Sequence, residues 1–199
     1  MRTEPAQPGC AVQWTAFATG FLAVWPALLA GVWLQSMLAL EPRSAAAALW
    51  YAALPEELIK FAAAALLGLF GAPAVLVGLG FGVSETVFLV SASPWPLRLL
   101  TSVPLHAGTT ALALLIVEHR RRLKTGTLHH RNEGSIRTRR LDPVWKAASV
   151  TGLLAMAILL HWIYNLAVRQ AGLVHWLLAW LPLILWLLLR SLMNQRLHD

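Results

Sequence analysis

Three glutamates, two histidines and one asparagine stand out because they lie inside long apolar stretches of the chain. They are Glu56, Glu57, Glu85, His106, His161 and Asn165. An ionisable group at the centre of a bilayer costs at least about 2.5–3.5 kcal/mol on insertion scales, so pairing or function must offset that cost. Carboxylates serve as general bases, imidazoles as proton donors or oxyanion stabilisers, and an amide can orient a carbonyl group. Together these groups suit the activation of water.

The same residue types also permit a metal centre. Glu56, His106 and His161 are a possible ligand set for an open catalytic zinc site, whose fourth position would hold water. However, the zinc motif HExxH is absent, and the two histidines lie in different apolar segments. Adjacent carboxylates in a low dielectric resist double ionisation, so Glu56 and Glu57 can supply a proton donor and an acceptor together. This favours glutamate-activated water without metal, with zinc still open.

A purely structural interpretation exists for each of these residues. Lys60 follows Glu57 by three positions and Glu56 by four, so either carboxylate can form a buried ion pair with it. A histidine within the membrane often serves as a hydrogen-bonding link between helices. The ion pair accounts for only one of two carboxylates, and the six residues fall at similar expected depths. We therefore expect one converging polar centre.

Composition places the chain in a membrane. Of 199 residues, 58% are hydrophobic and 13% are charged, with a net charge of +7. Soluble domains carry about 25% charged residues, and disordered basic chains lack such apolar content, so both classes are excluded. The single cysteine, Cys10, excludes a disulfide framework. The first apolar stretch lacks the features of a signal peptide and is expected to be a retained span.

Uncharged stretches of about 20 residues predict an all-α, polytopic transmembrane bundle. We expect six spans, at 14–40, 45–70, 73–92, 97–117, 147–168 and 173–189. Pro55 is expected to kink the second span. The chain is predicted to be one membrane domain, 1–199, whose site-bearing core covers 45–170. The glycines of the GLGFG run at 78–82 lack a nucleotide-binding context, and their spacing of four indicates close helix packing.

The positive charges predict the orientation. Nine of the 16 lysines and arginines lie in a basic loop at 119–146: Arg120, Arg121, Arg122, Lys124, Arg131, Arg137, Arg139, Arg140 and Lys146. The positive-inside rule makes this loop cytoplasmic and, with six spans, both termini as well. A patch for nucleic acid or anionic lipid is the alternative, but the loop has only one aromatic residue, Trp145. We expect a multi-pass protein of the plasma (inner) membrane that contacts lipid and no nucleic acid.

Four motifs in order resemble the PrsW family of intramembrane proteases, which are related to the CAAX-processing membrane endopeptidases. EELIKF at 56–61 resembles the EExxK signature, and GFGVSE at 80–85 resembles the second motif. Arg98 with PLH at 104–106 and the threonines at 109–110 resembles the third motif, and HWIYN at 161–165 resembles the HxxxN motif. The match covers about residues 56–165. Thr86 stands where the family commonly has asparagine.

The resemblance implies an intramembrane endopeptidase that cleaves a membrane-embedded or juxtamembrane protein substrate. It implies a catalytic role for Glu56, Glu57, His106 and His161 and a supporting role for Lys60, Glu85 and Asn165. The residues alone give only a polar centre in a six-helix bundle. An ion- or proton-coupled transporter and a non-catalytic membrane scaffold are the alternatives. Substitution of Glu56 or His161 separates them, because only an enzyme would lose cleavage while still folding.

Overall fold

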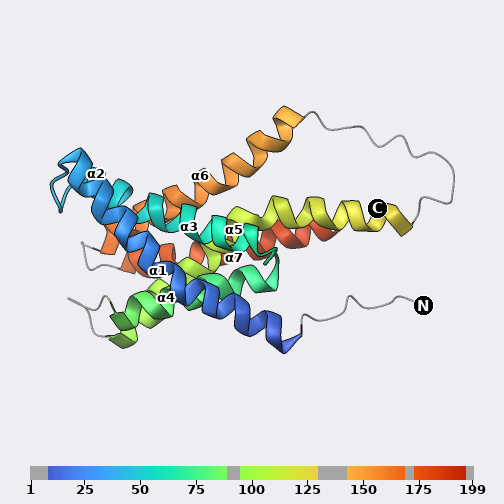
Figure 1. Cartoon of the computed structure of the whole chain (residues 1–199), viewed down its shortest axis with the longest axis horizontal. Helices are drawn as coiled ribbons and strands as arrows, with labels where there is room; N and C mark the ends of the chain where they lie inside the picture. The colour runs from blue at the N-terminus through green and yellow to red at the C-terminus, as the bar shows by residue number, and fades with distance from the viewer. Residues whose placement is uncertain (1–8, 89–94, 130–142, 169–172, 196–199) are drawn as a thin grey trace.

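The computed structural model describes residues 9–88, 95–129, 143–168 and 173–195, and these are helical with no strand among them (Figure 1). In chain order the elements are α1 (Cys10–Leu38), α2 (Ala45–Ala47), the π-helical segment η1 (Ala48–Ala53), α3 (Leu54–Leu66), α4 (Ala72–Phe88), α5 (Trp95–His129), α6 (Pro143–Val168) and α7 (Leu173–Gln195). The predicted all-α class is thereby confirmed.

Four helices are long and apolar enough to cross a membrane, and they lie in α1, α5, α6 and α7. The stretches are Cys10–Leu38, Pro96–Arg122, Ser149–Val168 and Leu173–Gln195. Most of the α5 stretch is buried, whereas less than a third of each of the other three is buried, as expected for helices that face lipid. The two remaining predicted spans are helical, but neither is among the four helices that are long and apolar enough to cross a membrane. Helix α4 has only 17 residues, and the α2–η1–α3 run contains three residues of the Asp/Glu/Lys/Arg class, Glu56, Glu57 and Lys60.

A π-helical segment ends two residues before Pro55, the position at which the sequence predicts a kink. Proline has no backbone N–H, so Pro55 cannot donate to the carbonyl of Tyr51 as an α-helix would require. At the end of η1 the N–H of Leu54 instead bonds to the carbonyl of Leu49, five residues back. The wider turn keeps the chain helical from Ala45 to Leu66. It sets the direction in which α3 presents the two glutamates that follow.

Helix α5 is the central element, packed against α4, α6 and α7 (Figure 1). The glycines of α4 allow very close approach to its neighbours. A Cβ atom built on Gly78 would lie 2.1 Å from the carbonyl oxygen of His106, and one on Gly82 would lie 2.8 Å from the Cα of Val103. Gly80 makes the equivalent approach to α1 at Phe17. The prediction of helix packing for the GLGFG run is therefore confirmed.

The region predicted as a basic loop is helical at both ends, because α5 continues to His129 and α6 begins at Pro143. Residues 130–142, which include Arg131, lie outside the described residues. At this end of the bundle the buried carboxylate of Glu118 pairs with Arg122 on its own helix and with Arg190 of α7, at 3.3 Å. The pair with Arg190 links α5 to α7, twelve residues along α5 from His106.

Candidate functional site

A buried polar cluster lies where α3, α4, α5 and α6 meet. Five of the sequence-predicted residues and Lys60 converge here from all four helices. Their contacts extend to three further side chains of α5, namely Arg98, Ser102 and Thr109. The close packing of α4 on α5 through Gly78 and Gly82 brings the α4 and α5 members within hydrogen-bond reach.

Glu57 is the most connected member of the cluster and is 1% exposed. Its Oε1 atom lies 2.6 Å from Nζ of Lys60, 2.7 Å from Nδ1 of His161 and 3.0 Å from Oγ1 of Thr109. A carboxylate buried with three donors is stabilised as the charged form by hydrogen bonds and by the adjacent ammonium group. Glu57 therefore joins α3 to both α5 and α6.

Lys60 is fully buried, and its ammonium group contacts three polar side chains. Besides Glu57 it contacts Nδ1 of His106 at 2.8 Å and Oγ1 of Thr109 at 3.4 Å. The ring of Phe81 lies beneath it, with the centroid 4.9 Å from Nζ. Of the two ion pairs that the sequence allows, the structure contains the one with Glu57.

Glu85 holds the opposite side of the His106 ring. Its Oε2 atom lies 3.0 Å from Nε2 of His106 and accepts a hydrogen bond from the Ser102 hydroxyl. Its Oε1 atom lies 3.3 Å from a guanidinium nitrogen of Arg98. Thr86 does not contribute, because its hydroxyl donates to the backbone carbonyl of Gly82. Glu85 thus obtains its partners from α5 rather than from its own neighbour.

Glu56 differs from Glu57 and Glu85 because it takes part in none of the hydrogen bonds described above for the cluster. Its Oε2 atom is buried without a hydrogen-bond partner, as is the Oε2 atom of Glu57. The Oε2 atom of Glu56 lies 3.6 Å from Nε2 of His161 and 4.0 Å from Nε2 of His106. Both separations exceed a direct hydrogen bond and suit a small polar group held between the three side chains. The Glu56 side chain is 15% exposed, so it is more accessible than either histidine.

The spacing of these three residues also admits a metal ion. One ligand atom from each of Glu56, His106 and His161 lies within 4.8 Å of the others. Tetrahedral zinc with bonds of about 2.0–2.1 Å would place its ligand atoms about 3.3 Å apart, which requires only small side-chain movements. The hydrogen bond from His161 to Glu57 is of the kind that orients histidine ligands. A bound zinc ion would supply a Lewis acid and an acidic water at this place.

Asn165 is the predicted site residue that the structure leaves outside the hydrogen-bonded cluster. It lies half-buried one helical turn beyond His161, and no hydrogen bond joins its side chain to the cluster residues described above. Thr109 belongs to the third motif of the sequence, whereas Ser102 was not among the predicted residues. Ser102 lies four residues before His106 and Thr109 three residues after it, so both share its helical face, and this spacing is the signal that would have found Ser102.

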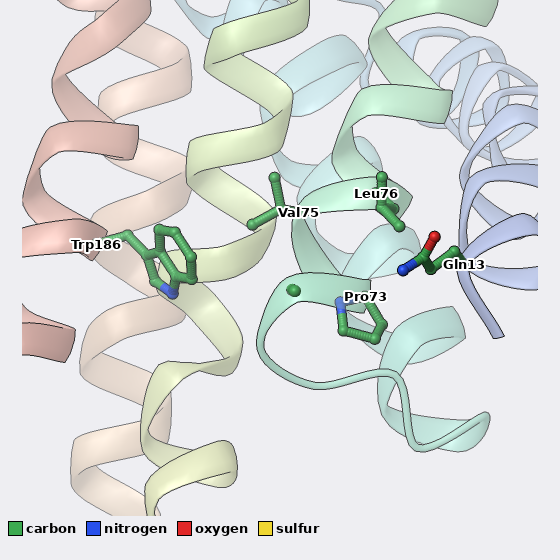
Figure 2. A pocket seen from close by; sticks show the side chains of 6 residues that line it. Gln13, Pro73, Val75, Leu76 and Trp186 are labelled. Atoms are coloured by element: carbon green, nitrogen blue, oxygen red, sulfur yellow. The ribbon is translucent and has the colours of Figure 1, made fainter. Parts of the chain in front are cut away.

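One cavity among the described residues lies away from the polar cluster. It has a volume of about 380 Å³ and lies beside the first turn of α4, between Gln13 of α1 and Trp186 of α7 (Figure 2). Its remaining lining residues are apolar, and it shares no residue with the polar cluster. We therefore do not assign this cavity to the candidate site.

Comparison of the chain with family models, curated proteins and solved structures found no match in any of the three.

Proposed function

We propose that the protein is an intramembrane endopeptidase that hydrolyses a peptide bond of a membrane-embedded or juxtamembrane protein substrate. The observation that carries the proposal is the position of the unpartnered Oε2 atom of Glu56, 3.6 Å from Nε2 of His161. The other ring nitrogen of His161 is held by Glu57 at 2.7 Å. A carboxylate and an oriented imidazole that face a common point are the groups that water activation requires.

The reaction would begin with a water molecule between Glu56 and His161. The carboxylate of Glu57 accepts a hydrogen bond from the N–H group at Nδ1 of His161. The ring nitrogen Nε2 therefore carries a lone pair, which can accept a hydrogen bond from this water. Glu56 takes a proton as the water oxygen bonds to the carbonyl carbon, and the carbonyl electrons move to its oxygen. When the tetrahedral intermediate collapses, the C–N bond breaks and the Glu56 proton goes to the leaving nitrogen. The products are a carboxyl group and an amine.

The developing oxyanion needs a hydrogen-bond donor, and the side chain of Asn165 is our candidate. It follows His161 by four residues, so the two side chains share one face of α6. Because it is only half-buried, its amide remains accessible to a substrate carbonyl. Removal of one such donor typically costs about 10²–10³ in rate.

The resemblance to the PrsW family supports this assignment, because the residues of all four motifs lie in or beside the cluster. We further propose six membrane crossings, with α2–η1–α3 and α4 as the two beyond the four long apolar helices. The termini and the basic segment at 119–146 would then be cytoplasmic, in a plasma (inner) membrane.

The test compares membrane proteomes of cells that contain the wild-type protein with cells that contain Glu56→Gln. Labelling of new N-termini should identify at least one membrane protein that is cut only with the wild-type chain, at equal amounts of both chains in the membrane. The same substrate should be cut by the purified protein in lipid vesicles. Identical sets of N-termini in the two membranes would contradict the proposal. Loss of ion or solute flux in Glu56→Gln, with no change in N-termini, would instead indicate a carrier.

A further inference from the structure

We infer that His106 is a positioning residue: a neutral imidazole, protonated on Nε2, that links Lys60 to Glu85 rather than activating water or binding a metal. The two histidines of the cluster would then carry their protons on different ring nitrogens and have different roles. The inference deepens the proposed function, because it assigns water activation to Glu56 and His161 alone. The protonation pattern itself can be measured without any proteolytic activity.

The donors and acceptors around His106 determine its tautomer. Nδ1 lies 2.8 Å from Nζ of Lys60, and an ammonium group can only donate, so Nδ1 must be the acceptor. The same Nζ atom forms an ion pair with Oε1 of Glu57, at 2.6 Å. The positive charge beside Nδ1 opposes protonation at that nitrogen. The single ring hydrogen therefore lies on Nε2, where Oε2 of Glu85 accepts it at 3.0 Å.

His161 has the opposite arrangement. Its Nδ1 atom lies 2.7 Å from the carboxylate of Glu57, which can only accept, so the ring hydrogen lies on Nδ1. Its Nε2 atom therefore presents a lone pair, and the nearest charged group described there is Glu56, at 3.6 Å. Both rings are buried, at 1% and 2% exposure, but only His161 keeps a nitrogen for a reacting molecule.

The two hydrogen bonds of His106, to Lys60 and to Glu85, form what we call the His106 bridge, and its position explains its role. His106 lies between two ion pairs, Glu57–Lys60 and Glu85–Arg98. Through its two nitrogens these pairs become one hydrogen-bonded chain that joins α3, α5 and α4 and extends to α6 through His161. This series of hydrogen bonds fixes the turn of α3 on which Glu56 lies. Loss of the bridge would displace Glu56 without removing any group that contacts the water.

The bridge also bears on metal binding. A histidine binds zinc through an unprotonated nitrogen. The nitrogen of His106 that faces Glu56 is the one that carries the hydrogen. Glu56 and His161 would remain, which is one ligand fewer than the three protein ligands of catalytic zinc sites. The spacing of the three residues permits zinc, but the hydrogen bonds of His106 oppose it.

The first experiment measures the tautomers by nitrogen-15 NMR of the full-length protein, labelled at histidine and held in lipid nanodiscs at neutral pH. His106→Gln and His161→Gln assign the signals. We expect a one-bond nitrogen–hydrogen coupling at Nε2 of His106 and at Nδ1 of His161. Addition of one equivalent of zinc should leave the His106 signals in place. A hydrogen on Nδ1 of His106, or displacement of both sets of signals by zinc, would overturn the inference.

The second experiment uses glutamine as the conservative replacement. Its amide oxygen can accept from Lys60 while its amide NH₂ donates to Glu85, so His106→Gln preserves the bridge but cannot replace imidazole as a base or a zinc ligand. On the substrate identified above, we expect His106→Gln to keep kcat within about tenfold of wild type. His106→Ala and His161→Gln should each lose about 10²-fold or more.

Equal inactivity of His106→Gln and His161→Gln, with both folded, would assign a chemical role to His106 and overturn the inference. A wild-type protein that cuts no substrate would contradict the proposed protease function, and the NMR measurement would still decide the tautomer. The two failures are therefore distinguishable.

Discussion

The Nδ1 atom of His161 lies 2.7 Å from Oε1 of Glu57, although 104 residues separate them in the chain. Consecutive residues of an α-helix point about 100° apart, so Glu57 contacts Nδ1 of the ring while Oε2 of the adjacent Glu56 lies 3.6 Å from Nε2 of the same ring. The pair of glutamates is thereby divided into one carboxylate with three hydrogen-bond partners and one that takes part in none of the hydrogen bonds described for the cluster. This division is the basis of the roles that we propose for them.

Replacement of Glu56 by glutamine should abolish proteolysis without unfolding the protein. Glutamine keeps the size of the side chain but cannot take a proton, and loss of a general base costs about 10²–10⁴ in rate. The measurement is kcat of the purified protein in lipid vesicles, together with its thermal unfolding. Glu41→Gln is the matched control, because Glu41 is exposed and lies outside the cluster, and it should match wild type. Wild-type turnover by Glu56→Gln would refute the catalytic assignment.

Replacement of Lys60 by methionine should impair folding as well as activity. The substitution removes the ammonium partner of a carboxylate that is 1% exposed, and breaking a buried ion pair costs about 3–5 kcal/mol. We expect a lower unfolding temperature and less protein in the membrane. The double variant Glu57→Gln with Lys60→Met removes both charges and should recover part of the lost stability. If Lys60→Met is as stable as wild type, the ion pair does not support the fold.

Sequence periodicity predicted the helical class, the approximate positions of all the long helices and the packing role of the α4 glycines. These features depend on local patterns, such as the length of an apolar stretch or the spacing of small residues. The number of crossings was harder to derive, because α4 has 17 residues and the α2–η1–α3 run carries Glu56, Glu57 and Lys60 within its length. Helix α4 is apolar but short, and the α2–η1–α3 run lacks the uniform apolar character on which span assignment depends.

Within the cluster, matched depth indicated which residues would converge but not how they would pair. Lys60 had two possible carboxylate partners on its own helix, and the choice depended on where α5 and α6 place Thr109 and His161. The link from Lys60 to His106 joins residues 46 positions apart and has no local signal. Helix rotation and packing set such contacts, and neither is determined by spacing along one helix.

A methyl group at Gly78 should separate α4 from α5 and weaken the cluster. The added Cβ would lie 2.1 Å from the backbone oxygen of His106, which cannot move as a flexible side chain would. Overpacking of this kind costs about 1–3 kcal/mol or more, and the shift would move Glu85 away from His106. We expect Gly78→Ala to lower both the unfolding temperature and kcat.

The matched control for that substitution is Gly152→Ala in α6. A Cβ at Gly152 meets no atom within 4 Å, and alanine favours the helix by roughly 0.8–1.0 kcal/mol over glycine. This variant should be as active as wild type and at least as stable. Equal behaviour of the two variants would contradict the importance of close approach at Gly78.

The proposed topology can be tested by labelling single cysteines with a reagent that does not cross the membrane. The natural Cys10 is exposed and would first be replaced by serine. Cysteines at Arg131 and Ser93, two positions outside the described residues, should then be labelled from the cytoplasmic side and the outer side respectively. This follows from the nine positive charges at 119–146 and an even number of crossings. Labelling of position 131 from outside would contradict the proposed orientation, and labelling of both positions from the same side would contradict the arrangement of the crossings.

Removal of metal should leave proteolysis intact. The adjacent glutamates provide a carboxylate that can take the water proton, and His106 presents a protonated nitrogen to Glu56, so two ligands remain for zinc. The measurement is kcat of protein purified with a chelator, together with its metal content by mass spectrometry. We expect full activity at a zinc content far below one ion per chain. Stoichiometric zinc, with activity lost to the chelator and restored by zinc alone, would establish Glu56, His106 and His161 as ligands instead. That result would also require Lys60 to release Nδ1 of His106 in the active protein, because the hydrogen would have to leave Nε2.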